Sequence, residues 1–253
     1  MSIFRLQQFS IEQSQSGMKV CSDSLLFGAM IPIDGAKRIM DIGTGTGILA
    51  LMQAQKVHSS EYYDFDKITA VELTQAAAEE SRKNFKASPW ASSIELVEQD
   101  IQGFSKKSQA TEQAGYDLII CNPPFFVDHS RTKSSDELRA LARHTDTLSY
   151  EDLCSAMANL LATDGSIFVL LPTASIESFS EIAKLSELAV VEITEVSETE
   201  GHASKVAMIR LAARVGCLPA IVPRNIVYKF NENHTHTAVV KEYLADFLLR
   251  YAK

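Results

Sequence analysis

A strand-like run that ends at two consecutive prolines constrains this chain more than any other stretch. Residues 116–120 read Tyr-Asp-Leu-Ile-Ile, and the next residues are Cys121, Asn122, Pro123, Pro124, Phe125 and Phe126. Proline has no backbone N–H and a fixed φ, so neither a central strand nor a helix continues through such a pair. We therefore expect the backbone to leave a sheet at Asn122 in a stiff, extended turn.

This turn carries groups that could hold a planar ligand bearing an NH₂. The amide oxygen of Asn122 and the carbonyl of Pro123 could accept its two hydrogens, and the ring of Phe125 could stack on its face. A strand-ending turn with two core phenylalanines is the other interpretation. The turn alone does not decide between them.

A glycine-rich loop lies upstream at a suitable distance. Residues 38–51 are typical of a strand, a loop and a helix, with Asp41 followed by Gly43, Gly45 and Gly47. Glycines let the backbone turn tightly and approach a ligand closely, and the following helix directs its positive end at the site. The segment therefore predicts a cofactor-binding loop.

The type of cofactor follows from the residues around the glycines. A P-loop is excluded because no Lys-Ser/Thr pair follows them. A nicotinamide loop remains a weak match through Gly45, Gly47 and Ala50. The acid in Asp-x-Gly-x-Gly-x-Gly favours S-adenosyl-L-methionine instead, because a carboxylate there could hold the amino-acid end of that cofactor through water or the loop.

Two further strands end in acids. The strand over 67–72 ends at Glu72, where a carboxylate could accept both hydroxyls of a ribose. The strand over 93–100 ends at Asp100, which could accept from the adenine amine. One acid after a strand is usually a helix cap, but three in succession form a pattern. The candidate cofactor-binding residues in these segments are Asp41, Gly43, Thr44, Gly45, Gly47, Glu72, Leu73, Asp100, Ile101 and Asn122.

Length and composition suit one soluble enzyme domain over residues 1–253, with residues 1–30 as an N-terminal lid segment and residues 31–253 as the core. No run of about 18 apolar residues predicts a membrane span, and the N-terminus has no apolar signal core. The four cysteines are scattered, and His234 and His236 read as an exposed pair. We therefore expect a cytoplasmic protein without metal.

Strand and helix patterns alternate along most of the chain. The expected strands cover 37–41, 67–72, 93–100, 116–120, 166–171, 189–195 and 206–212, with a short extra strand at 225–230. Helices are expected between them, with Ser22 or Asp23 capping one over 24–30 and a final helix over 237–251. Such alternation predicts an α/β fold with a mostly parallel sheet covered by helices on both faces.

The glycine loop and the Asn122-Pro-Pro-Phe turn together resemble those of amino-methyltransferases, which methylate an NH₂ on a base or on glutamine. With Gln8-Phe9, the segment from Met18 to Asp23, and Ala142-Arg143-His144, the chain resembles the bacterial tRNA adenine-N6-methyltransferases that modify the adenine just 3′ of the anticodon in a valine tRNA. Residues 56–66 look longer than the usual loop, and Phe125 stands where many relatives have Tyr. The second difference removes a hydroxyl but keeps the ring.

The resemblance implies a Rossmann-like seven-stranded sheet whose last strand is antiparallel. It implies that Asn122, Pro123, Pro124 and Phe125 form the catalytic turn, and that Lys19 and Asp23 lie on a segment that closes over the cofactor. Protein glutamine-N5 methyltransferases and rRNA guanine-N2 methyltransferases share the Asn-Pro-Pro turn, but both usually carry a further domain. They remain the alternatives.

The charge of the chain bears on its partner. A net charge of −8 is awkward for an enzyme that binds RNA, because phosphate contacts usually need a basic surface. Basic residues nevertheless gather just after the prolines. We expect a tRNA substrate to contact this group, and the enzyme to act as a monomer or weak homodimer. The candidate RNA-binding residues are Arg131, Lys133, Arg139, Arg143 and His144.

Overall fold

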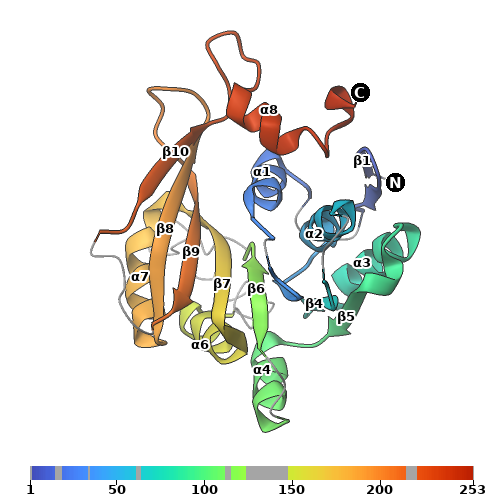
Figure 1. Cartoon of the computed structure of the whole chain (residues 1–253), viewed down its shortest axis with the longest axis vertical. Helices are drawn as coiled ribbons and strands as arrows, with labels where there is room; N and C mark the ends of the chain where they lie inside the picture. Colours follow the sequence, from blue (N-terminus) through green and yellow to red (C-terminus); the bar gives the residue numbers. More distant parts are fainter. Residues whose placement is uncertain are drawn as a thin grey trace, which may run out of the picture.

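A sheet of eight strands lies at the centre of the molecule (Figure 1). The computed structural model describes residues 2–14, 19–33, 35–60, 64–111, 115–123, 148–214 and 221–252. In the order in which they pair, the strands are β10 (Arg224–Tyr228), β8 (Leu188–Ser197), β9 (Val206–Ala213), β7 (Leu161–Pro172), β6 (Tyr116–Cys121), β3 (Arg38–Ile42), β4 (Lys67–Glu72) and β5 (Ile94–Glu98).

One strand of this sheet runs against the others. β9 is antiparallel to its neighbours β7 and β8, while every other pairing in the sheet is parallel. The predicted Rossmann-like sheet, mostly parallel with an antiparallel last strand, is thereby confirmed, and β10 is the extra strand expected near residue 225. The parallel strands therefore present their carboxyl ends at one common edge, where ligands of open α/β sheets bind.

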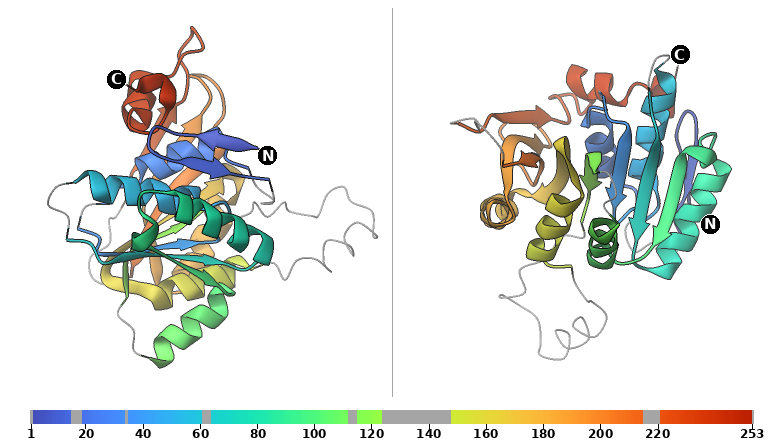
Figure 2. Two further views of the ribbon diagram at one scale, coloured as in Figure 1. Left: turned by 90° about the vertical axis from the view of Figure 1, so that its right-hand side faces the viewer. Right: turned by 60° about the horizontal axis from the view of Figure 1, so that its bottom comes forward.

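Helices cover both faces of the sheet, as predicted (Figure 2). Successive side chains of a strand point to opposite faces, and β3 has apolar residues on both: Ile39 belongs to one buried apolar cluster and Met40 to the other. The first cluster contains residues of α1 (Ser22–Met30), α2 (Ile48–Ser59), α3 (Gln75–Ala87) and α8 (Ala238–Leu244). The second contains residues of α4 (Ile101–Ala110), α6 (Tyr150–Leu160) and α7 (Ile176–Leu185).

The N-terminal residues form a small hairpin of β1 (Ile3–Arg5) and β2 (Ser10–Glu12). Asn84 of α3 fixes β2 by accepting from the backbone N–H of Glu12 and donating to its carbonyl. The second amide proton of Asn84 reaches the carbonyl of Thr46 at 2.8 Å. The N-terminal segment is thus connected through one buried side chain to the glycine loop.

Two helix ends differ from the sequence prediction. Cys21 caps α1 in place of Ser22 or Asp23, because its sulfur accepts from the Ser24 N–H while the Ser24 hydroxyl accepts from the Cys21 N–H. α8 ends at Leu244, well short of the predicted end. The carbonyls that would continue this helix, including that of Ala245, accept from the Gln7 side chain instead. None of the helices in the described ranges is long and apolar enough to cross a membrane.

Candidate cofactor and acceptor site

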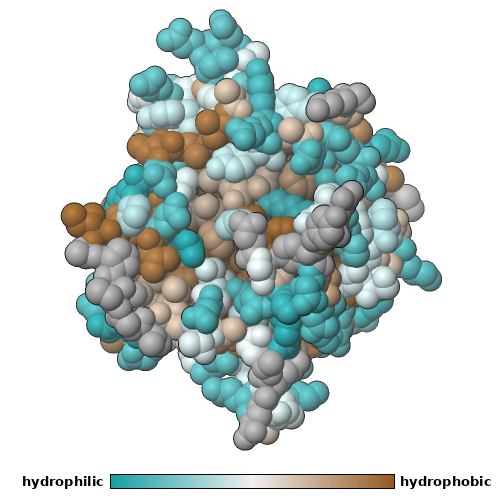
Figure 3. All heavy atoms as spheres, viewed as in Figure 1, coloured by the Kyte–Doolittle hydropathy of each residue, from teal (hydrophilic) through white to brown (hydrophobic). Residues whose placement is uncertain are grey.

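A cavity of about 190 Å³ opens at the carboxyl edge of the sheet. In the view of Figure 3, hydrophobic surface gathers near the middle of the face, where Figure 1 places α1 and the end of β6. The walls come from the lid segment, the glycine loop, the end of β4 and the end of β6. The lining residues are Lys19, Val20, Ser24, Gly43, Thr44, Gly45, Thr46, Ile48, Leu49, Glu72, Thr74, Ala77 and Asn122.

The glycine loop has the backbone that the sequence predicts. Gly43, Gly45 and Gly47 all have positive φ, at 68°, 56° and 84°. Gly47 also begins α2, and a Cβ built on it would lie 2.4 Å from the ring of Phe85. At this position only glycine combines the required φ with the close approach of a neighbouring ring.

Asp41 is buried beneath this loop and organises it. Its Oδ2 accepts from the hydroxyl of Thr44 at 2.6 Å and from the N–H of Ala50 at 3.2 Å. Its Oδ1 has no hydrogen-bond partner among the described residues. Burial raises the pKa of Asp41 to about 7. Asp41 is not among the residues that line the cavity, and its assignment to the cofactor, through the loop or through water, stays a prediction.

This pKa predicts a pH-dependent stability. Asp41 keeps its proton to higher pH in the folded chain than in the unfolded chain. Its contribution to stability is therefore fully present below pH 3.8, the ordinary pKa of the carboxyl group, and is lost as the pH rises through about 7. Asp41→Asn accepts the same two hydrogen bonds without ionising. In urea unfolding, the free energy of unfolding of the variant should rise relative to that of the natural chain by up to about 1.4 kcal/mol per pH unit between pH 5 and 7. Parallel pH profiles would contradict this assignment.

Glu72 connects the end of β4 to the loop. Its Oε2 accepts from the N–H of Gly45 at 2.9 Å, and its Oε1 accepts from the N–H and hydroxyl of Thr74. Each carboxylate oxygen can accept more than one hydrogen bond, so a ribose hydroxyl can still be bound. Leu73 beside it is 57% exposed and offers an apolar surface next to the cavity.

The third acid of the pattern performs the ordinary role of a helix cap. Oδ1 of Asp100 accepts from the N–H of Gly103 at 2.7 Å at the start of α4. Neither Asp100 nor Ile101 is among the residues that line the cavity. Their assignment to the cofactor stays a prediction.

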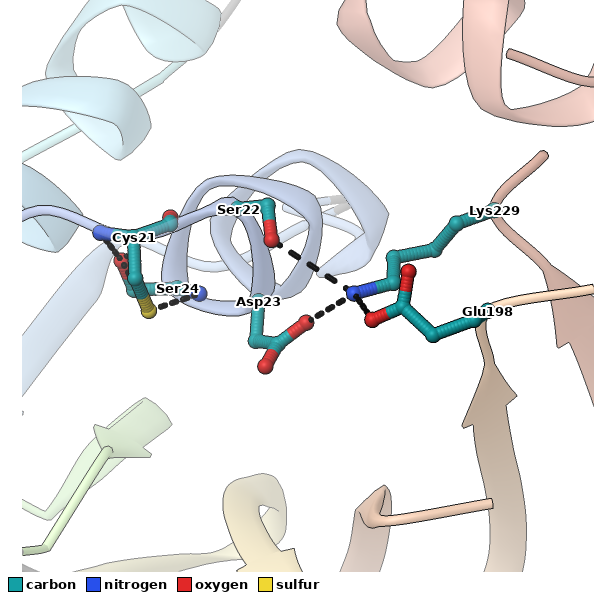
Figure 4. A network of polar contacts seen from close by, with 6 residues as sticks. All are labelled: Cys21, Ser22, Asp23, Ser24, Glu198 and Lys229. Carbon is teal, nitrogen blue, oxygen red and sulfur yellow. Dashed lines mark hydrogen bonds and ion pairs between the residues drawn. The ribbon is translucent and has the colours of Figure 1, made fainter. Parts of the chain in front are cut away.

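The two lid residues have different surroundings. Lys19 is exposed and lines the cavity. Asp23 instead forms an ion pair with Lys229, whose Nζ lies 2.9 Å from Asp23 Oδ1 and 2.6 Å from Glu198 Oε1 (Figure 4). Burial lowers the pKa of Lys229, but the hydrogen bonds to the two carboxylates outweigh burial and raise it overall. No pattern in the sequence singles out Lys229, because it belongs to no motif.

The proline turn reaches the same cavity. Asn122 follows β6 and lines the cavity with Gly43 and Glu72, and Pro123 is buried. The structure thus brings the amide of Asn122 beside the glycine loop. Several cavity residues were absent from the predicted set because they are apolar or small, among them Val20, Ser24, Ile48, Leu49 and Ala77. The remaining candidates lie outside the described residues: Pro124, Phe125, Arg131, Lys133, Arg139, Arg143 and His144.

Histidines and cysteines form no site in the part of the chain that the structure describes. No group of three or more potential metal ligands occurs there. His236 shares a hydrogen bond of 2.7 Å with the hydroxyl of Tyr251. Cys121 and Cys154 are buried, and burial raises the pKa of both thiols, that of Cys154 to about 12. Neither thiol is activated as a nucleophile.

The sequence matches a known family and several named relatives. Residues 14–171 match the model of the methyltransferase small domain. A tRNA1(Val) (adenine(37)-N6)-methyltransferase of Shewanella baltica strain OS185 is 36% identical over 249 residues, which cover 98% of this chain and 99% of the relative. A protein of the same name from Bacteroides fragilis strain ATCC 25285 is 40% identical over 180 residues, or 71% of each chain.

Solved structures support the fold. The crystal structure of a predicted O-methyltransferase from Agrobacterium tumefaciens superposes with a TM-score of 0.65 at 18% identity, covering 87% of this chain and 94% of that one. A class I S-adenosylmethionine-dependent methyltransferase from Listeria monocytogenes, described as putative, gives a TM-score of 0.55 at 16% identity over 81% of this chain and 62% of that one. At such identities the likeness concerns the fold alone.

Proposed function

The chain belongs to the tRNA1(Val) (adenine(37)-N6)-methyltransferase family, and we propose that Asn122 and the glycine loop form the site of its reaction. The reaction is the transfer of a methyl group from S-adenosylmethionine to N6 of adenine 37 in this tRNA. The observation that carries the assignment of the site is that Asn122, Gly43 and Glu72 line one and the same cavity.

The residues of the cavity fit S-adenosylmethionine. The positive-φ glycines leave the loop backbone open to a close approach, and Glu72 offers acceptors for ribose hydroxyls. Leu73, which follows Glu72 but does not line the cavity, offers an exposed apolar face beside it. Lys19 at the lid supplies a cation suited to a carboxylate. When bound, the cofactor supplies an electrophilic methyl group on its sulfonium.

The acceptor turn addresses the weak nucleophilicity of adenine N6, whose lone pair is drawn into the ring. Acceptance of its two hydrogens by the amide oxygen of Asn122 and the carbonyl of Pro123 favours a tetrahedral nitrogen with its lone pair directed at the methyl group. Transfer is then a direct displacement in which positioning supplies a large part of the rate. The methylated nitrogen becomes acidic and loses its proton readily, so no strong base is required.

The tRNA contacts belong to the proposal as well. The target base has to leave its stack to reach Asn122. Stacking on Phe125 would offset part of that cost, by roughly 1–3 kcal/mol. Because the chain carries a net charge of −8, a few local contacts must hold the phosphates. The residues proposed for them are Arg131, Lys133, Arg139, Arg143 and His144.

We also propose that one chain suffices for the reaction, in a single domain, since the cofactor loop and Asn122 line one cavity. A monomer or weak homodimer in the cytoplasm, where tRNA is modified, is consistent with this arrangement.

Mass spectrometry of nucleosides tests the proposed function. Purified enzyme, S-adenosylmethionine and unmodified tRNA1(Val) should yield N6-methyladenosine, and the same transcript with guanine at position 37 should yield none. tRNA from a deletion strain should lack the modification. Methylation of a protein glutamine, or of guanine N2 in rRNA, without any product on tRNA1(Val) would favour the two alternative methyltransferase classes.

A further inference from the structure

The buried ammonium of Lys229 lies at the functional edge of the sheet. Lys229 directly follows β10 and Glu198 directly follows β8, and these strands are parallel. Both residues therefore lie at the carboxyl edge that also carries Asn122 after β6. The Lys229 side chain is 7% exposed, yet it is not among the residues that line the cavity.

Lys229 joins this edge to the beginning of α1 (Figure 4). Its Nζ donates to Asp23 at 2.9 Å and approaches the hydroxyl of Ser22 at 3.5 Å. The backbone N–H of Lys229 donates to the carbonyl of Ser197, which fixes the lysine to β8. The first turn of α1 is thus held by a side chain that is itself anchored in the sheet.

The same turn of α1 contributes to the cofactor cavity. Ser24 is buried and lines the cavity, and Val20 lines it just before the helix begins. The reciprocal cap between Cys21 and Ser24 makes the start of the helix one rigid unit. A movement of Asp23 away from β8 would therefore move the cavity wall.

We propose that Lys229 is a positioning residue for cofactor binding, which holds the first turn of α1 in place as a wall of the cavity by pairing with Asp23 and Glu198. The inference rests on the proposed function, since it takes this cavity as the S-adenosylmethionine site. It also gives Asp23 a role through Lys229 in place of a direct contact with the cofactor.

Removing the ammonium has an effect beyond the loss of one contact. Asp23 and Glu198 both accept from the same nitrogen, Lys229 Nζ, at 2.9 and 2.6 Å. Without it, two carboxylates face each other in a partly buried space, where like charges repel and are poorly solvated. The repulsion pushes α1 away from β8 and enlarges the cavity.

Calorimetry with S-adenosylhomocysteine on Lys229→Met measures this effect. Affinity should fall roughly threefold to thirtyfold, the range for mutations that act on a site through other residues. The KM for S-adenosylmethionine should rise by the same factor, with kcat at saturation little changed. Lys229→Arg should retain most of the affinity. The matched control is Lys67→Met, which removes an exposed pair with Glu95 at the β4–β5 edge and should leave affinity unchanged.

A double-mutant cycle separates positioning by Lys229 from direct binding by Asp23. Asp23→Asn should weaken binding by itself, but in the Lys229→Met background it should restore part of the lost affinity, because it removes one of the two carboxylates that repel each other. Additive losses would show that Asp23 contacts the cofactor independently, and would overturn the inference. So would a Lys229→Met protein that binds normally while unfolding at lower temperature, because Lys229 would then be merely structural.

Two further outcomes are distinguishable. If Lys229→Met does not fold, Glu198→Gln decides, because Glu198 does not line the cavity and can act on it only through its pair with Lys229. Normal binding by that variant overturns the inference. If the natural chain itself fails to bind S-adenosylhomocysteine, the proposed function fails instead.

Discussion

Asn122→Ala should abolish methylation of tRNA1(Val) while S-adenosylhomocysteine binds within a few-fold of its normal affinity. Asn122 lines the cavity at the end of β6, and its proposed hydrogen bond to the target amine strengthens only as the nitrogen becomes tetrahedral. Removing one positioned polar group of this kind lowers kcat by about 10²–10³. Single-turnover rates with saturating cofactor and tRNA measure the loss.

The chain offers a matched control for this substitution. Asn225 lies on β10, is exposed, and donates to Glu192 across the β10–β8 pair. Asn225→Ala removes a side-chain amide of the same kind, but on a strand that is separated from β6 by β8, β9 and β7, and it should leave turnover unchanged. A near-normal rate for Asn122→Ala would refute the role given to its amide.

Gly47→Ala should produce the largest loss of stability of the substitutions considered. The φ of 84° costs an L-residue about 1–2 kcal/mol, and the new Cβ would lie 2.4 Å from the Phe85 ring. Overpacking of a buried contact adds about 1–3 kcal/mol. The sum of roughly 2–5 kcal/mol is a large fraction of the stability of a typical domain. Urea unfolding of the free protein measures it.

Gly35→Ala separates the cost of a positive φ from the cost of overpacking. Gly35 has a φ of 75° like that of Gly47, but a Cβ there would meet nothing within 4 Å. Its loss should be limited to the conformational term of about 1–2 kcal/mol. Equal losses for the two variants would mean that Phe85 moves aside easily. The excess loss in Gly47→Ala should be accompanied by weaker binding of S-adenosylhomocysteine, because Gly47 belongs to the loop that lines the cavity.

Local sequence patterns predict much of the fold. Alternating residues such as Ile39 and Met40 join opposite cores, so the strand pattern correctly predicts a sheet covered on both faces. The glycines at 43, 45 and 47 predict a tightly turning loop, and all three have the positive φ that glycine adopts readily. The prolines after Asn122 predict the end of β6, because proline cannot continue a central strand.

The acids at the strand ends show where such reasoning stops. Glu72 and Asp100 look alike in sequence, but Glu72 lines the cavity whereas Asp100 caps α4. A carboxylate after a strand can accept hydrogen bonds from the first turn of a helix, from a loop or from a ligand, and the sequence looks the same in all three cases. Which of these it serves depends on the element that follows and on its distance from the cavity.

The sequence by itself determined the glycine loop, the strand end at Asn122 and the family, because each of the motifs behind them consists of residues close together in the chain. Only the tertiary structure decided that Asp41 holds the loop, that Asn84 connects it to the N-terminal hairpin, and that Asp23 pairs with Lys229. Asp23 and Lys229 are separated by 206 positions. Such a contact exists only because sheet order brings the end of β10 to the first turn of α1, and no local pattern of residues encodes that proximity.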